Sequence, residues 1–196
     1  MSLSHPDLFE PASADLPEGL RYRPDLITPG EEQRLVAAFA PLPFKEFEFH
    51  GHLGKRRVVA FGWRYDYSRR EVNLSEPIPD FLLPLRGRAA DFAGLPADDL
   101  HQALVTEYTP GAGIGWHRDK PMFGEVLGIS LLSSCTLRFR REVAGGWERR
   151  SLTPAPRSVY LLQGPSRTEW QHSIPGVDAL RYSVTFRRYL GRTNAS

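Results

Sequence analysis

The second half of the chain alternates between short hydrophobic runs and turn-forming residues. From about residue 101 onward the runs are HQALVTEYT, GIGWH, VLGISLL, TLRFRR, WERRSL, SVYLL, EWQHSI and LRYSVTFRRYL. Some of them switch between apolar and polar at every residue, which is the period of a β-strand. Short strands separated by regular turn signals predict an all-β sandwich or barrel for this half.

The first half predicts two helices. In the stretch ITPGEEQRLVAAFA, Thr28 is placed to cap the first helix, Pro29 occupies its first position and Glu31 closes a capping box. A second helix is expected within 80–93, with Pro84 in its first turn. The apolar positions that recur at helical spacing are Leu35, Val36 and Phe39 in the first helix, and Leu82, Leu85, Ala89 and Phe92 in the second.

The remaining segments set the expected domain boundaries. Residues 44–67 alternate and are rich in aromatic side chains, which predicts two or three strands around a glycine-containing turn at 51–54. Residues 1–19 are polar and rich in proline, and we expect a flexible arm there. One domain is expected over 20–196, because 196 residues with 41% hydrophobic content fit a single core.

Composition excludes several classes of protein. Cys135 is the only cysteine, so the chain has no internal disulfide and no cysteine-rich zinc site, which suits a reducing compartment. The N-terminal stretch lacks the features of a signal peptide, and no window approaches the ~20 apolar residues of a membrane span. We therefore expect a cytoplasmic protein with no membrane partner.

Charge adds one hint about ligands. The formal net charge is only +2, but just three of the 25 cationic residues are lysines. Arginine binds carboxylates and phosphates through two parallel hydrogen bonds, so its predominance favours recognition of anions. An arginine-rich genome composition explains the same bias equally well.

Candidate metal ligands occur on two of the predicted strands. In GIGWHRDK, His117 and Asp119 lie two residues apart, so on one strand both would face the same way. His172 follows 53 residues after Asp119. Two imidazoles and one carboxylate form the facial triad that holds Fe(II) and leaves positions open for reactants. The alternative is that His172 is an ordinary strand histidine bonded to a backbone carbonyl.

A polar face on the last strand suggests an anion site. In RYSVTFR, the positions Arg181, Ser183, Thr185 and Arg187 share one face, and the other face is apolar. If the polar face lines the interior of a barrel, its two arginines require an anion, because an unpaired buried charge is very costly. A dicarboxylate cosubstrate would supply that anion. The alternative is that the polar face lies in solvent.

The segments LVTEYTPGAGIGWHRDK, WQHSI and RYSVTFR together resemble the AlkB-type branch of the 2-oxoglutarate- and iron(II)-dependent oxygenases, over roughly residues 20–190. The resemblance implies an α+β, mainly β fold, a double-stranded β-helix (distorted jelly roll) braced by N-terminal helices. It also implies that the segment SIPGVDAL crosses from one sheet to the facing sheet, so that Arg181 and Arg187 face the metal across the barrel.

The resemblance assigns roles to particular residues. His117, Asp119 and His172 resemble the iron ligands, and Arg181 and Arg187 resemble the pair that grips the carboxylates of 2-oxoglutarate. Further cosubstrate contacts are implied at Tyr108, Thr185, Ser183 and Thr106. Thr106 and Ser183 stand where many relatives have asparagine, and both keep a side chain that forms hydrogen bonds.

The implied cosubstrates are Fe(II), 2-oxoglutarate and dioxygen. Oxidative decarboxylation of 2-oxoglutarate to succinate would be coupled to hydroxylation of a C–H bond. A hydroxylated methyl group on a nucleobase nitrogen is lost as formaldehyde, which restores the base. This chemistry implies an alkylated nucleic acid as partner, with DNA favoured and RNA possible. Separately, we expect a monomeric protein.

Substrate recognition is expected in the segment 44–67, which resembles the variable lid of AlkB-type enzymes. Trp63, Tyr65 and Arg57 are its candidate substrate contacts, because basic and aromatic residues interleave there. The alternative is a strand that packs its aromatics onto the first helix. Pro121 stands where DNA-repair relatives often carry an acidic residue, and the lid is similar to those of relatives that act on tRNA.

Two other functions fit the same residues. The enzyme could act on RNA, tRNA or a protein side chain instead of DNA. The chain could also be a nucleic-acid-binding β-domain without catalytic activity, in which the spacing of His117 and Asp119 is a coincidence. That second alternative predicts nucleic-acid binding that ignores iron and weakens steeply with salt.

Overall fold

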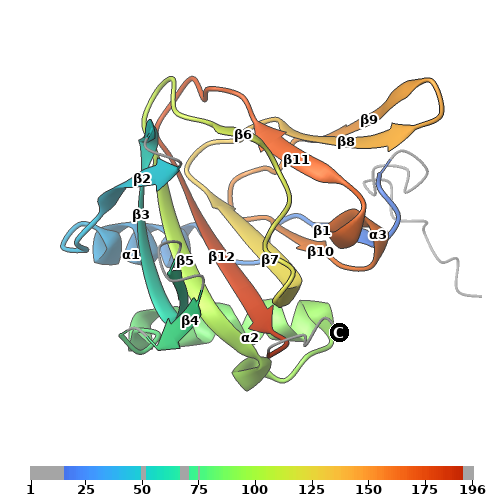
Figure 1. Cartoon of the computed structure of the whole chain (residues 1–196). Coiled ribbons are helices and arrows are strands. Elements are labelled where there is room, and N and C mark those ends of the chain that lie inside the picture. The colour runs from blue at the N-terminus through green and yellow to red at the C-terminus, as the bar shows by residue number, and fades with distance from the viewer. Residues whose placement is uncertain (1–15, 50–51, 67–70, 75, 192–196) are drawn as a thin grey trace, which may run out of the picture.

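Two antiparallel sheets face each other in this computed structural model, which describes residues 16–49, 52–66, 71–74 and 76–191, without the side chains at 47–54 and 64–75 (Figure 1). The larger sheet has the order β1-β10-β7-β12-β5-β3-β2, with β4 beside β3, and the smaller has the order β6-β11-β8-β9. The larger sheet consists of β1 (Leu20–Arg23), β2 (Lys45–Phe49), β3 (His52–Asp66), β4 (Glu71–Leu74), β5 (Leu100–Tyr108), β7 (Phe123–Leu131), β10 (Val159–Leu162) and β12 (Arg181–Tyr189). The smaller consists of β6 (Ile114–His117), β8 (Leu137–Val143), β9 (Gly146–Leu152) and β11 (Gln171–Ile174).

This arrangement confirms the predicted mainly β, jelly-roll architecture. Each hydrophobic run of the second half forms a strand. The segment after Ile174 carries the chain from β11 in the smaller sheet to β12 in the larger, as the family resemblance implied. Residues distant in sequence are therefore brought onto two facing surfaces.

The two main helices, α1 (Pro29–Phe39) and α2 (Leu83–Ala93), lie on the face of the larger sheet that is turned away from the smaller sheet, whereas the short α3 (Pro165–Thr168) lies beside β10 and β11 (Figure 1). The other short helices are η2 (Asp80–Leu82) and η3 (Ala97–Asp99). The capping box of α1 is confirmed, because Thr28 Oγ1 accepts from the Glu31 N–H and the Glu31 carboxylate accepts from the Thr28 N–H. Proline occupies the first turn of α2, also as predicted.

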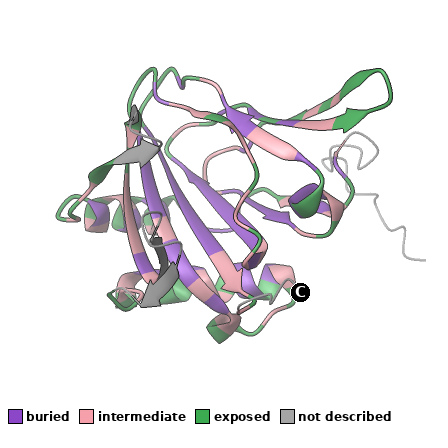
Figure 2. Ribbon diagram, in the orientation of Figure 1, coloured by how far each residue is buried: buried purple, intermediate pink, exposed green. Residues whose placement is uncertain are grey.

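Strand alternation divides the hydrophobic residues into two clusters. The first joins the helices to the outer face of the larger sheet, where Phe39, Val184 and Phe186 are buried. The second lies between the sheets and includes Tyr108 and Phe139. Figure 2 shows buried residues along most of β5, β7 and β12, while the β8–β9 hairpin is largely exposed. The opposite, polar face of β12 therefore points into the space between the sheets.

Two sequence-based boundaries, those around Asp119 and around the turn at 51–54, need correction. Strand β6 ends at His117, so Asp119 lies in the loop that follows rather than on the strand. The expected arm over 1–19 falls mostly outside the described residues, but its last residues contact the protein, since the Glu18 carbonyl accepts from the Ser166 N–H. Strand β3 already begins at His52, which shortens the turn expected at 51–54. No helix in the described part of the chain is both long and apolar enough to cross a bilayer.

Candidate functional site

The three candidate ligands converge between the sheets. His117 and His172 are cross-strand partners in β6 and β11, and their ring centroids are 4.2 Å apart. Directly opposed residues share one face of a sheet, so both imidazoles point toward the larger sheet. Asp119 reaches the same place from the loop after β6, with its Oδ2 3.7 Å from His172 Nε2. Strand pairing therefore unites His117 and His172, which lie 55 positions apart in the sequence.

Both imidazoles are prepared to bind a cation. The Nδ1 of His117 lies 2.9 Å from the Gly115 carbonyl oxygen, so Nδ1–H donates a hydrogen bond to that oxygen and the lone pair of Nε2 is left free. Burial lowers the pKa of His117, and burial with the neighbouring His117 charge lowers the pKa of His172 to about 3. Neutral imidazole is the form that coordinates metals.

Asp119 completes the donor set. Burial would raise its pKa, but the charges of Arg187, His172 and His117 hold the pKa well below the usual range, so the group is a carboxylate. Its Oδ1 accepts from Arg187 Nε at 3.0 Å and Nη2 at 2.9 Å. The other oxygen, Oδ2, faces His172.

These donors fit a divalent transition-metal ion in type, and two of them, His172 and Asp119, also fit it in spacing. Metal–nitrogen and metal–oxygen bonds are about 2.1 Å long, so two ligands of one ion lie within about 4.2 Å of each other. The 3.7 Å between His172 Nε2 and Asp119 Oδ2 meets that limit. Within residues 16–49, 52–66, 71–74 and 76–191, no three His, Cys, Asp or Glu side chains yet form a complete metal-binding cluster, and Arg187 is the cation that neutralises Asp119.

Opposite these ligands, Arg181 lies fully buried in the larger sheet. Its side chain is 1% exposed, its Nε donates to Ser130 Oγ at 3.2 Å, and its guanidinium carbon is 4.9 Å from the centre of the Tyr108 ring. Its Nη1 has no hydrogen-bond partner among the described residues. A buried cation with an unmet N–H group is costly, and a bound carboxylate would remove that cost.

The other predicted cosubstrate residues line the same surface. In the register of β12 with β5, Arg181 is opposite Tyr108 and Ser183 is opposite Thr106. Cross-strand partners share a face, so these residues point toward the smaller sheet together with Thr185 and Arg187. Burial agrees, since the residues that are less than a tenth exposed include Thr106, Tyr108, Arg181, Ser183 and Thr185. The structure therefore brings all six predicted residues to one wall.

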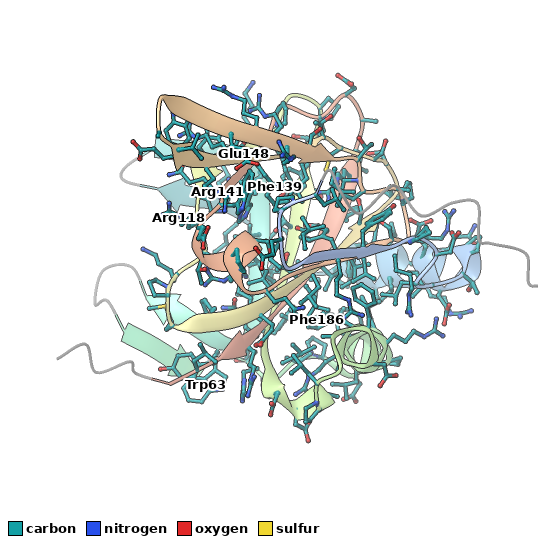
Figure 3. All side chains as sticks on the ribbon, turned by 90° about the vertical axis from the view of Figure 1, so that its right-hand side faces the viewer. Trp63, Arg118, Phe139, Arg141, Glu148 and Phe186 are labelled. Atoms are coloured by element: carbon teal, nitrogen blue, oxygen red, sulfur yellow. The ribbon has the colours of Figure 1, made fainter. Side chains whose placement is uncertain are left out.

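The three predicted substrate residues do not lie together. Trp63 stacks on Tyr189 at a centroid distance of 5.0 Å, and Tyr189 in turn contacts Phe123, whose ring lies 5.7 Å from the Arg187 guanidinium carbon. Figure 3 shows Trp63 at the far end of the larger sheet from the labelled residues of the smaller sheet. The side chain of Tyr65 lies outside the described part of the structure. Residues 57–62 of the expected lid are an integral part of the larger sheet, since they pair with β5.

Arg57 does not join this group. It pairs with Glu107 at 2.7 Å, and Tyr182 donates to the same carboxylate at 2.9 Å. Tyr182 belongs to the cluster under the helices, so Arg57 lies on the outer face of the larger sheet. The sequence-based role of Arg57 in substrate contact is therefore replaced by an ion pair on the opposite side of the sheet.

Sequence reasoning missed four residues of the site. Gln102 accepts from Arg187 Nη1 at 2.9 Å, and it lies on the same alternating face of β5 as Thr106 and Tyr108, so the strand period could have found it. Ser130 holds Arg181. The ring of Tyr160 lies against the backbone of β7, because a Cβ at Gly128 would come within 2.2 Å of it. The fourth residue is Arg167.

Arg167 holds the loop that carries Asp119. It is buried, its Nε donates to the Gly124 carbonyl at 3.0 Å, and its Nη2 donates to the carbonyls of Lys120 and Phe123 at 2.5 and 2.7 Å. One guanidinium thus ties Lys120, in the loop after β6, to Phe123 and Gly124 at the start of β7. We regard Arg167 as a positioning residue for Asp119.

Arg167→Met should weaken metal binding roughly 10- to 100-fold, the usual effect of removing a residue that orients a ligand. Titration with Mn²⁺ or Co²⁺ measures this directly, without turnover. Arg118→Met is the matched control, because Arg118 is exposed in the same loop and, within the described part of the chain, donates only to the Glu169 carbonyl. Equal metal affinity in wild type and Arg167→Met would contradict the positioning role.

Comparison with known proteins agrees with this geometry. The family model described as the 2OG-Fe(II) oxygenase superfamily matches residues 19–187. An Arabidopsis thaliana protein named "Alkylated DNA repair protein ALKBH8 homolog" is 30% identical over 181 residues, covering 80% of this chain and 51% of that protein. A Xenopus tropicalis protein named "tRNA (carboxymethyluridine(34)-5-O)-methyltransferase alkbh8" is 26% identical over 174 residues, covering 84% of this chain and 26% of that protein.

This chain therefore spans about half the length of the plant relative and about a quarter of the length of the frog relative. Among solved structures, "The structure of OsALKBH1" superimposes with a TM-score of 0.62 at 16% identity, covering 87% of this chain and 97% of that one. At that identity the likeness concerns the fold alone.

Proposed function

Because this chain belongs to the 2OG-Fe(II) oxygenase superfamily and has AlkB-type relatives, we propose that it is a 2-oxoglutarate-dependent dioxygenase that demethylates alkylated nucleobases in DNA. One observation carries the proposal: two neutral imidazoles of the smaller sheet meet a carboxylate from the following loop, and the facing sheet presents a buried arginine with an N–H group that has no partner among the described residues. His117, Asp119 and His172 would hold Fe(II), which when bound supplies the activation of dioxygen and the oxidative decarboxylation of 2-oxoglutarate.

The protein's own contribution is placement and charge. Arg181, held by Ser130 and stacked on Tyr108, offers its Nη1 to a carboxylate of 2-oxoglutarate. Arg187 keeps Asp119 ionised and is itself fixed by Gln102. The second hydrophobic cluster between the sheets, which includes Tyr108 and Phe139, limits the water around these charges. Because an oxidising centre attacks what is held close to it, such positioning decides which C–H bond reacts.

The two oxygen atoms of dioxygen end in different products. One oxygen atom of dioxygen enters succinate as 2-oxoglutarate loses carbon dioxide, and the other is inserted into a C–H bond of the methyl group. A hydroxymethyl group on a nucleobase nitrogen breaks its C–N bond, leaving as formaldehyde while the nitrogen regains a proton. Formaldehyde is therefore expected in the same amount as the succinate formed in excess of substrate-free turnover.

Two features support a nucleic-acid substrate. The printed name of the plant relative refers to repair of alkylated DNA, and the stacked pair of Trp63 and Tyr189 places aromatic surface near Arg187, where a flipped base can stack. RNA is the second candidate, favoured by the printed name of the frog relative, which refers to tRNA. We propose DNA as the substrate because the plant relative is the more similar of the two.

A substrate panel tests the proposal. Methylated single-stranded DNA, methylated tRNA and a methylated peptide are incubated with Fe(II), 2-oxoglutarate and oxygen, and formaldehyde and succinate are measured. We expect DNA to give the fastest formaldehyde release and a slow conversion of 2-oxoglutarate without substrate. Faster release from tRNA would transfer the assignment to RNA. No succinate under any condition, with nucleic-acid binding indifferent to iron, would leave only the noncatalytic alternative.

A further inference from the structure

The outer face of the smaller sheet carries a cluster of arginines and tryptophans remote from the cosubstrate residues. We call Trp116, Arg138, Arg140, Trp147 and Arg149 the Arg–Trp patch. The guanidinium carbon of Arg140 lies 4.4 Å from the ring centre of Trp116 and 4.3 Å from that of Trp147. The guanidinium carbon of Arg138 also approaches Trp116 and lies 5.1 Å from its ring centre. Cations and aromatic rings thus alternate along three strands.

Strand alternation places this patch on the outer face of the smaller sheet, turned away from the larger sheet. In β8, Leu137 and Phe139 are buried between the sheets, so Arg138 and Arg140 point the other way. Trp116 precedes His117, whose side chain points inward, so the Trp116 ring lies on the outer face. The indole of Trp147 is 40% exposed. A pocket of about 360 Å³ opens beside Trp116, Arg138 and Arg149.

The patch holds an excess of positive charge. Residues Leu137–Leu152 contain five arginines and two glutamates, a net charge of +3, in a chain whose net charge is only +2. The two other arginines of the hairpin, Arg141 and Arg150, both pair with Glu148 at 2.8 Å. None of the three patch arginines forms a salt bridge with a carboxylate in the described part of the chain.

The patch arginines are held in place against their mutual repulsion. Arg140 and Arg149 are directly opposite each other in the β8–β9 pairing, and like charges in that position destabilise a sheet. Arg138 Nε donates to Ser173 Oγ at 3.1 Å and Arg140 Nε donates to Gln171 Oε1 at 2.7 Å. The guanidinium groups of Arg138 and Arg140 are therefore each oriented by a hydrogen bond from Nε, and in the described part of the chain their terminal nitrogens form no further hydrogen bond. An anion bridging them would remove the repulsion.

We propose that the Arg–Trp patch binds the sugar–phosphate backbone of single-stranded nucleic acid. Planar guanidinium groups match phosphate oxygens, and exposed tryptophan offers a surface on which any base can stack. The choice of nucleic acid over another polyanion rests on the proposed function. Because Trp116 is adjacent to His117, the bound strand lies along the back of the sheet that carries the candidate metal ligands. The patch thus adds affinity that does not depend on the alkylated base.

Binding of an unmodified, fluorescently labelled single-stranded oligonucleotide tests this, measured by anisotropy over a range of salt concentrations. The triple variant Arg138→Gln, Arg140→Gln, Arg149→Gln should raise Kd at least about tenfold. Each lost phosphate contact lowers the slope of log Kd against log salt by about 0.7 for single strands, so three contacts lower it by about 2.

The matched control is Arg21→Gln, Arg23→Gln, Arg34→Gln, which removes the same charge from exposed positions on β1 and α1. It should leave Kd within about twofold of wild type. Equal loss of binding in both triple variants, or in neither, would refute a local site. A second test compares two competitors, poly-glutamate and an unlabelled oligonucleotide, at equal total negative charge. If both displace the labelled oligonucleotide equally well, the nucleic-acid assignment is refuted.

A single variant controls for the case in which the triple variant does not fold. Arg149→Gln removes one of two opposed charges, so its melting temperature should equal or exceed that of wild type while its Kd rises. An intact fold with unchanged Kd would contradict the proposal. Conversion of 2-oxoglutarate to succinate without oligonucleotide should be the same in wild type and the triple variant. If wild type fails that assay, the proposed oxygenase function fails, and the anisotropy result still decides whether the patch binds nucleic acid.

Discussion

Asp119→Asn is expected to reduce iron-dependent formation of succinate and formaldehyde on the order of 10³-fold. Among the described residues, Asp119 is the only carboxylate that pairs with either histidine, and its Oδ2 is 3.7 Å from His172 Nε2. An amide of the same shape keeps an oxygen for Arg187 but is neutral and a poor ligand, so the stabilisation of several kcal/mol that a bound metal supplies is lost. The measurement is initial rate at saturating 2-oxoglutarate, with Mn²⁺ titration as a second readout.

The asparagine variant is preferred to alanine for a structural reason. The side chains of Asp119 and Arg187 are 8% and 14% exposed, and removing one partner of such a pair leaves a nearly buried cation. Thermal unfolding should therefore show Asp119→Ala less stable than Asp119→Asn. Glu125→Gln, which removes a carboxylate that pairs with Arg188 outside the cluster, should retain turnover. Full turnover in Asp119→Asn would remove the ligand assignment.

Arg181→Met is expected to raise the KM for 2-oxoglutarate roughly 10- to 100-fold and to leave Mn²⁺ affinity nearly unchanged. Hydrogen bonds to charged groups are worth about 1.5–3 kcal/mol each, and Arg181 Nη1 is a buried donor that finds no partner among the described residues. The same reasoning predicts that the variant without 2-oxoglutarate is at least as stable as wild type, because it no longer buries an unsatisfied cation. The melting-temperature increase produced by 2-oxoglutarate should disappear.

Arg181→Lys separates charge from shape. Lysine keeps the positive charge but cannot donate to Ser130 and to a carboxylate with the same planar geometry, so its KM should lie between those of wild type and Arg181→Met. An unchanged KM in Arg181→Met would contradict the assignment of this wall as the 2-oxoglutarate site. A large loss of Mn²⁺ affinity in Arg181→Met would mean that Arg181 acts on the metal ligands instead.

Strand period and capping chemistry predicted most of the fold. The alternation of RYSVTFR divided β12 into an apolar face under the helices and a polar face toward the candidate ligands, and the structure has both. The capping box at Thr28 and Glu31 is a local signal, which is why α1 begins where the sequence places it. The convergence of His117 with His172 required pairing of β6 with β11, which alternation cannot supply and the family resemblance implied.

The errors have a common physical origin. Arg57 and Trp63 are an even number of residues apart, so simple alternation predicts that they share a face. Gly62 interrupts the strand with a φ of 75°, and its N–H donates to the Glu76 carbonyl instead of to a neighbouring strand. Arg57 therefore pairs with Glu107 while Trp63 stacks on Tyr189. Arg167 has no sequence signal, because its partners are backbone carbonyls that any residue provides.

The crossing from β11 to β12 has a consequence for how activity is acquired. His117 and His172 meet only when β6 pairs with β11, and they oppose Arg181 only after the two sheets have closed on each other. Contacts between segments so distant in sequence form late, because the intervening chain must first lose its freedom. A folding intermediate in which only one sheet has formed would contain either the histidines or Arg181 in place, but not both. After dilution from denaturant, we therefore expect the spectroscopic signals of secondary structure to return first. Turnover should return later, when the two sheets dock.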